Sequence, residues 1–385
     1  MKDYLNSLVY EQISRSESLK KRIEKPLPYP ELSGLKERIN KIIDEQTMIL
    51  SSCLSELQER QDDSDCRDIL RIVRGSVRVI SDVETYGIAA LEYQTRESAF
   101  LNKVLFKIHQ EIKLPLSCPS VCCISTNYYF SVPFANVIFV PLLESDFLLH
   151  LPDLYHEIGH LVARNRESMI SIQNIKESFE KAFSKITDYY TELIKEKKKD
   201  VGPEEILQNI AYIHAQWKLW IEEFFCDLFG LYTLGPAYVW SNLHLTTKTS
   251  PDIHRLLVII EQSHPSDEAR MRMLFVGLRL LGFETEAEPI KTEWNKVKPF
   301  WGSPSPEYQY AYPDPLLQEI AQIFLEGIKE SGFSIVKQES LQNDNENVRF
   351  LLNQAWKNFW KLSSEDFRIW ETEQIDLLRK NLITA

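Results

Sequence analysis

The sequence lacks any run of apolar residues long enough to cross a membrane. A spanning helix needs roughly 18 consecutive apolar residues, and the best attempt, residues 134–151, is interrupted by Pro141, Glu144, Asp146 and His150. The first residues of the chain also lack the apolar stretch of a secretory signal. We therefore expect a cytoplasmic protein without a membrane partner.

The sequence has fewer basic than acidic residues. The chain carries 44 lysines and arginines against 56 aspartates and glutamates, which gives a formal net charge of −12. A surface of that sign repels phosphate backbones, so we expect no nucleic-acid partner. The 6 cysteines form no disulfide-like framework in a chain of 385 residues, and reduced thiols agree with a cytosolic protein.

Glycine is scarce, with 12 residues, and helical periodicity dominates the chain. The stretch 118–141 is the only convincing β region, and within it the apolar, β-branched run 136–140 indicates a strand. The sequence therefore predicts a mainly α fold with a small β-sheet. We expect the strand 136–140 to lie at the edge of that sheet, where an extended peptide can pair with it. The alternative is that other parts of the chain cover this strand.

The sequence does contain an HExxH motif, which runs from His156 to His160. Its two histidines are four residues apart, so a helix places both imidazoles on one face, where they can bind one zinc ion. Glu157 would lie beside them, close to a water molecule at the metal. The strand-like run 136–140 and Pro152 give the motif a strand-then-helix setting. The alternative is an ordinary amphipathic helix with two unrelated histidines.

A second motif offers a third ligand. Glu223 and Asp227 are also four residues apart, on a predicted helix whose other residues are mostly apolar. We predict that Glu223 binds zinc and that Asp227 accepts a hydrogen bond from a metal-bound histidine, with His156 as the first candidate. Glu222 is the rival ligand, but Cys226 stands where its partner carboxylate is needed. The alternative for the pair is an exposed carboxylate face.

HExxH followed downstream by ExxxD resembles the gluzincin metallopeptidases. A third block, Ser263–Leu274, contains His264 before a proline and then Arg270, and it is similar to the HtpX and CAAX-prenyl-protease type of gluzincin. The resemblance covers about residues 120–282 and implies a zincin-like catalytic core. The chain departs from the well-known members of that family, which are embedded in a membrane, because it has no spanning segment.

Helical patterns on both sides of this core predict a domain plan of three parts. We expect an N-terminal helical region at 1–115, the zincin-like core at 116–285 with a helical insertion at 166–205, and a C-terminal helical region at 286–385.

The simplest mechanism for these residues is peptide hydrolysis. Zinc held by the two histidines and Glu223 would activate a water molecule, and Glu157 would pass its proton to the leaving amine. His264, which precedes a helix start, is the candidate donor to the oxyanion. Arg270 would share that role or orient the site by a charge-assisted bond. The alternative is a plain helix start with Arg270 at the surface.

We therefore expect a zinc endopeptidase that acts on proteins or peptides. A free cytosolic protease would be hazardous to the cell, so we expect the access of substrates to its cleft to be gated. The sequence does not identify a regulatory protein partner. Two further hypotheses are a zinc hydrolase of a small amide and a non-catalytic scaffold that holds zinc as a structural element. Glu157 separates the scaffold from the enzymes, because a structural site has no use for a base beside the metal.

Overall fold

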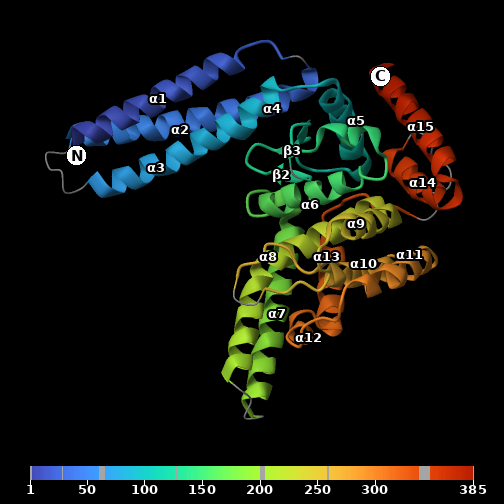
Figure 1. The fold of residues 1–385 in the computed structure, drawn as a ribbon. Coiled ribbons are helices and arrows are strands. Elements are labelled where there is room, and N and C mark those ends of the chain that lie inside the picture. The colour runs from blue at the N-terminus through green and yellow to red at the C-terminus, as the bar shows by residue number, and fades with distance from the viewer. Residues whose placement is uncertain are drawn as a thin grey trace. The chain divides into compact units, whose positions relative to one another are not determined.

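The computed structural model divides the chain into two compact units (Figure 1). Unit 1 comprises Met1–Phe106 and Ser117–Leu143, and unit 2 comprises Lys107–Leu116 and Glu144–Ala385. This division differs from the three regions expected from the sequence, because the β region falls in the unit of the N-terminal helices and the C-terminal helices fall in the unit of the HExxH motif. The structure describes residues 2–27, 29–59, 66–126, 128–199, 204–257, 260–337 and 347–384.

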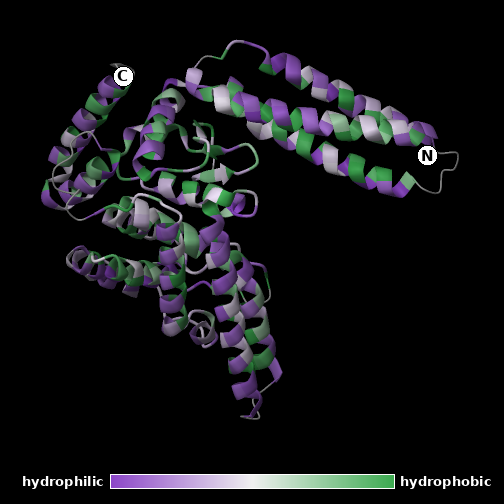
Figure 2. Ribbon diagram, turned by 180° about the vertical axis from the view of Figure 1, so that it is seen from behind, coloured by the Kyte–Doolittle hydropathy of each residue, from purple (hydrophilic) through white to green (hydrophobic). Residues whose placement is uncertain are grey.

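Long amphipathic helices make up most of unit 1, namely α1 (Lys2–Ile23), α2 (Ser33–Glu59) and α3 (Cys66–Asp82). On α2 the buried residues recur at helical spacing and include Ile39 and Ile43, so one stripe of the helix faces the core. Figure 2 shows hydrophobic and hydrophilic residues alternating along these helices. The N-terminal residues are thus helical, as the sequence predicted.

Helix α3 continues into a π-helical turn, η3 (Val83–Ile88), and then into the short helix α4 (Ala89–Glu92). Helix α5 (Arg96–Ile112) follows after a break in the chain direction. Thr95 stands at that break, and its Oγ1 accepts a hydrogen bond of 3.1 Å from the backbone N–H of Ser98. This bond satisfies one of the N–H groups that the start of α5 leaves without a helical partner.

The sheet of unit 1 contains β1 (Ser120–Cys122), β2 (Phe130–Val132) and β3 (Val137–Phe139). Their order is β1-β3-β2, with β3 parallel to β1 and antiparallel to β2. The mainly α fold with a small sheet is confirmed, but the edge position expected for the strand 136–140 is wrong. Strand β3 has a hydrogen-bonded neighbour on both sides, so it has no free edge for a peptide to join.

In the part of the chain that the structure describes, the regular secondary structure of unit 2 is helical. The helices are α6 (Asp153–Asn165), α7 (Gln173–Lys199), α8 (Glu204–Leu234), α9 (Pro236–Thr249), α10 (Asp267–Leu280), α11 (Glu284–Val297), α12 (Tyr308–Ala311), α13 (Asp314–Glu330), α14 (Val348–Lys361) and α15 (Ser364–Thr384). Short 3₁₀ turns in the two units are η1 (Pro30–Leu32), η4 (Leu142–Asp146), η5 (Ile170–Ile172) and η6 (Lys298–Phe300). None of the described helices is both long and apolar enough to cross a membrane.

Helix α8 forms the centre of unit 2. Residues 223–234 of this helix are all buried, and a helix that is buried on every side belongs to a core. It packs against α6, α7, α9, α10 and α13. The carboxylates of Glu223 and Asp227 therefore lie inside the unit, where an ionised group needs a charged or hydrogen-bonding partner.

Helices α6 and α8 are in close contact at Gly159. A Cβ atom at this position would lie 2.9 Å from the Cα of Cys226 and 3.1 Å from its Cβ, which is closer than such atoms pack. Glycine in a helix is otherwise unfavourable, so its presence here is explained by the contact between the two backbones. The close approach brings the HExxH helix against the helix that carries Glu223 and Asp227.

We predict opposite effects for one substitution at two helical glycines. Gly159→Ala should lower the free energy of unfolding by about 1–3 kcal/mol, because α6 and α8 must separate to admit the methyl group. Gly75→Ala on α3 should raise it by about 0.5–1 kcal/mol, because nothing lies within 4 Å of the added atom and alanine favours the helix. Thermal and urea unfolding followed by circular dichroism measure both changes. A stabilising Gly159→Ala would contradict the close approach of the two helices.

Candidate metal centre

Helix α6 presents the two histidines of the motif on one face. The helix begins at Asp153, after Pro152, and buries nearly all of its residues through Ala163. The rings of His156 and His160 lie edge to face, with 4.9 Å between their centroids. One turn of helix therefore places two imidazoles beside each other, as the spacing of four residues predicts.

Helix α8 brings Glu223 against both rings. Its Oε2 lies 3.4 Å from Nε2 of His156, and its Oε1 lies 3.4 Å from Nε2 of His160. Two nitrogens and a carboxylate thus converge on one point, and they are the donor types of a zinc site with three protein ligands. In the described part of the chain, Oε2 of Glu223 is buried without a hydrogen-bond partner, and a cation would satisfy it.

The charges of this group are strongly coupled. Burial alone would raise the pKa of Glu223, but the imidazoles of His156, His160 and His264 outweigh it and lower the pKa to about 2. Burial would likewise lower the pKa of His156, but the carboxylates of Asp227 and Glu223 raise it to about 10. Both shifts favour the charged forms of the two groups, so a metal ion that binds there would compete with the proton of His156.

Cys226 offers a different third donor. Its Sγ and ring nitrogens of His156 and His160 all lie within 4.8 Å of one another. However, burial and the surrounding carboxylates raise the pKa of the Cys226 thiol well above its ordinary value. The same sulfur also packs against Gly159, 3.3 Å from the position of a Cβ there. Glu223 is the better ligand because it is already ionised and reaches Nε2 of both histidines.

Asp227 stands behind His156 and has no exposed surface. Arg270 donates to it through Nε (2.8 Å) and Nη2 (2.6 Å), and the hydroxyl of Tyr238 donates at 2.5 Å. Nδ1 of His156 lies 3.1 Å from Asp227 Oδ1 and 3.0 Å from the Tyr238 oxygen. Burial would raise the pKa of Asp227, but Arg270 and His156 outweigh it and hold the pKa well below its usual range. The contact predicted between Asp227 and His156 is therefore part of the structure.

Glu222 occupies the same position behind His160. Its Oε1 lies 3.1 Å from Nδ1 of His160 and accepts a hydrogen bond of 2.8 Å from Arg164. Although burial opposes ionisation, these two partners lower the pKa of Glu222. Each histidine thus has a carboxylate at Nδ1 and presents Nε2 to Glu223, which fixes the tautomer that binds metal. Glu222, considered in the sequence as a rival ligand, lies at the nitrogen that faces away from Glu223.

Glu157 follows His156 in α6 and is buried. The residue is 6% exposed, and its Oε2 is buried without a hydrogen-bond partner among the described residues. A buried carboxylate oxygen without a partner can accept a proton from a water molecule or from a substrate group.

His264 and Arg270 reach the centre differently. Nε2 of His264 lies 3.6 Å from Oε1 of Glu223, and its side chain is 61% exposed, so this residue forms the border of the centre with solvent. The helix expected after it begins at Asp267, where Ser266 Oγ accepts a hydrogen bond of 3.2 Å from Ala269 N–H. The guanidinium of Arg270 donates two hydrogen bonds to Asp227. Of the two roles considered for Arg270, this contact agrees with orienting the site by a charge-assisted bond.

Sequence reasoning missed Tyr238, Arg164 and the orienting position of Glu222. Tyr238 lies on α9, which begins directly after Gly235, a residue with φ of 90° that turns the chain back after α8. Only the tertiary packing of α9 against α8 brings its hydroxyl to Asp227. The Gly235-Pro236 pair predicts a turn, but it does not indicate which side chain after the turn lies next to Asp227.

The chain matches no protein-family model, no curated protein and no solved structure. The resemblance to the gluzincins therefore rests on the three motif blocks, and the zincin-like core remains a prediction.

We predict that the bond between Arg270 and Asp227 stabilises the fold independently of metal. Arg270→Met should lower the free energy of unfolding by about 3–5 kcal/mol, because it leaves a buried carboxylate without its cation. Arg279→Met, on the exposed side of the same helix, should change it by less than about 0.5 kcal/mol. Thermal unfolding in excess EDTA measures both variants without a contribution from bound metal. Equal stability of the two variants would contradict the prediction.

Proposed function

We propose that this chain is a zinc-dependent metallopeptidase that uses a gluzincin-like ligand set. The observation that carries the proposal is the convergence of His156 Nε2, His160 Nε2 and both oxygens of Glu223. A surface helix with two unrelated histidines does not explain a third buried, ionised group aimed at both rings. The buried, unpartnered oxygens of Glu157 and Glu223 also favour a site that binds a cation and a water molecule.

Zinc in such a site would supply Lewis-acid polarisation of a carbonyl and of water. The protein residues supply orientation and proton transfer. Asp227 and Glu222 hold the two imidazoles through Nδ1, and Arg270 and Tyr238 hold Asp227 in turn. The ligand geometry is therefore set before any substrate arrives, which is the condition for electrostatic catalysis without reorganisation.

Glu157 is the proposed general base. It takes a proton from water as the water oxygen bonds to the carbonyl carbon of the substrate. It then delivers that proton to the amide nitrogen as the carbon–nitrogen bond breaks, so the products are a carboxylate and an amine. The burial of Glu157 next to His156 in α6, with its Oε2 unpartnered among the described residues, supports this role.

A peptide bond in a protein or peptide is the proposed substrate. His264 is the proposed contact with the substrate at the metal centre, because its ring is mostly exposed while its Nε2 stays 3.6 Å from Glu223. A neutral imidazole there can donate a hydrogen bond to the developing oxyanion. Hydrolysis of a small amide uses the same chemistry, and the experiments below separate the two substrate classes.

Zinc binding should distinguish the three candidate side chains on α8. Glu223→Gln should abolish stoichiometric zinc binding, because it removes the ligand shared by both histidines. Glu222→Gln should weaken zinc binding by about 10–100-fold, the usual cost of losing a residue that orients a ligand. Cys226→Ala should leave zinc affinity unchanged. Competition with a chromophoric chelator measures all three, and loss of zinc in Cys226→Ala alone would overturn the assignment of Glu223.

Proteolysis should depend on Glu157. Glu157→Gln should retain one zinc ion and lose about 10²–10⁴-fold in rate, because the proton acceptor is gone while the ligands remain. The surface variant Glu167→Gln is the matched control and should be fully active. Cleavage of unfolded casein and labelling of new N-termini in cells measure the effect. New termini that appear equally with Glu157→Gln would contradict the proposal, and zinc binding without any protein cleavage would favour the small-amide substrate.

A further inference from the structure

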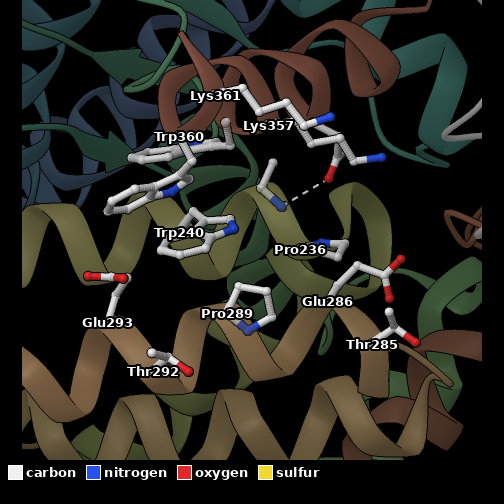
Figure 3. A pocket seen from close by; sticks show the side chains of 13 residues that line it. Pro236, Trp240, Thr285, Glu286, Pro289, Thr292, Glu293, Lys357, Trp360 and Lys361 are labelled. Carbon is white, nitrogen blue, oxygen red and sulfur yellow. Dashed lines mark hydrogen bonds between the residues drawn. The ribbon is translucent and has the colours of Figure 1, made fainter. Parts of the chain in front are cut away.

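A cavity of about 460 Å³ lies in unit 2 between α9, α11 and α14 (Figure 3). This volume is in the range of pockets that hold small organic molecules. Its residues are distinct from those of the metal centre. The cavity is lined by tryptophans and two prolines, together with charged residues.

Tryptophans form the apolar part of the cavity. Trp240 of α9 stacks on Trp356 with 6.0 Å between ring centroids, and it lies 4.9 Å from the ring of Trp360. Figure 3 shows Trp240 and Trp360 at the cavity, with Pro289 of α11 below Trp240. Trp360 is 47% exposed, although a ring of this size is normally covered in a folded protein. A flat or apolar group that enters the cavity would cover it.

Hydrogen bonds connect two of the helices that line the cavity. Asn353 of α14 accepts a hydrogen bond of 3.0 Å from Ala237 N–H and donates one of 2.9 Å to the carbonyl of Leu234. These bonds join α14 to the start of α9. The opening between the helices is therefore part of the packed structure and does not need a ligand to form it.

Unpaired positive charge stands on the α14 side of the cavity. Lys357 and Lys361 are one turn apart, both are exposed, and neither has an ion-pair partner in the described part of the chain. On the α11 side, Glu286 and Glu293 also line the cavity. Glu293 is paired with Lys296 at 2.6 Å, and Glu286 has an interaction partner of its own. Among the described residues, the unpartnered charge at the cavity is therefore positive, and it lies next to an aromatic surface.

We propose that this cavity binds a small amphipathic molecule with an aromatic or apolar ring body and one anionic group. The ring body would stack against Trp240 and Trp360, and the anion would lie between the ammonium groups of Lys357 and Lys361. Aromatic contact and charge pairing are separate contributions, so each can be removed without the other. The site does not depend on the proposed peptidase activity.

A matched pair of fluorescent probes tests the proposal on the full chain. 8-Anilino-1-naphthalenesulfonate carries the anion, and N-phenyl-1-naphthylamine has the same rings without it. We expect saturable binding of one molecule of each, with the sulfonate bound more tightly. Lys357→Gln together with Lys361→Gln should weaken the sulfonate roughly fivefold and leave the neutral probe unchanged. Trp360→Ala should weaken both probes about three- to tenfold.

Controls keep the result specific to the cavity. Lys329→Gln, on the exposed surface of α13, should leave both affinities unchanged, and circular dichroism should show that every variant is folded. Equal binding of the two probes by the wild type, or sulfonate binding that survives both the lysine and the tryptophan substitutions, would overturn the proposal. Loss of probe binding as the protein dimerises in sedimentation would also overturn it, because a second copy would then be the occupant.

Discussion

The buried carboxylate of Asp227 is the constraint on which the rest of unit 2 depends. An ionised group with no exposed surface is costly unless several donors surround it. Here the donors come from three other helices: Arg270 from α10, Tyr238 from α9 and His156 from α6. The requirement to satisfy one charge on α8 therefore fixes the positions of its neighbours. The proposed catalytic geometry and the stability of the fold use the same bonds.

Local geometry explains what could be predicted from the sequence. A spacing of four residues places two side chains on one helical face whatever the tertiary structure, so the pairs His156 with His160 and Glu223 with Asp227 were predictable. Their meeting across two helices could be expected only from the resemblance to a known ligand pattern. The role of Glu222 at Nδ1 of His160 was not predictable, because a rotation of α8 by one residue decides which carboxylate faces which nitrogen.

Features that depend on packing between distant segments were missed for the same reason. The central position of β3 follows from its pairing with β1 and β2 on either side, which an apolar run of residues does not encode. The aromatic cavity needs Trp240 and Trp360 to meet, although 120 positions separate them in the chain. The composition of the sequence does not indicate where the packed helices leave space.

Gly159 changes the meaning of the motif in this fold. The two middle positions of HExxH are normally free to vary, because only the outer residues take part in the chemistry. In this chain any side chain at the second middle position meets the backbone of α8 at Cys226. The motif is therefore more restrictive here than its general form, because the spacing between two helices sets the choice of residue at this position. A search for related sites should include that glycine.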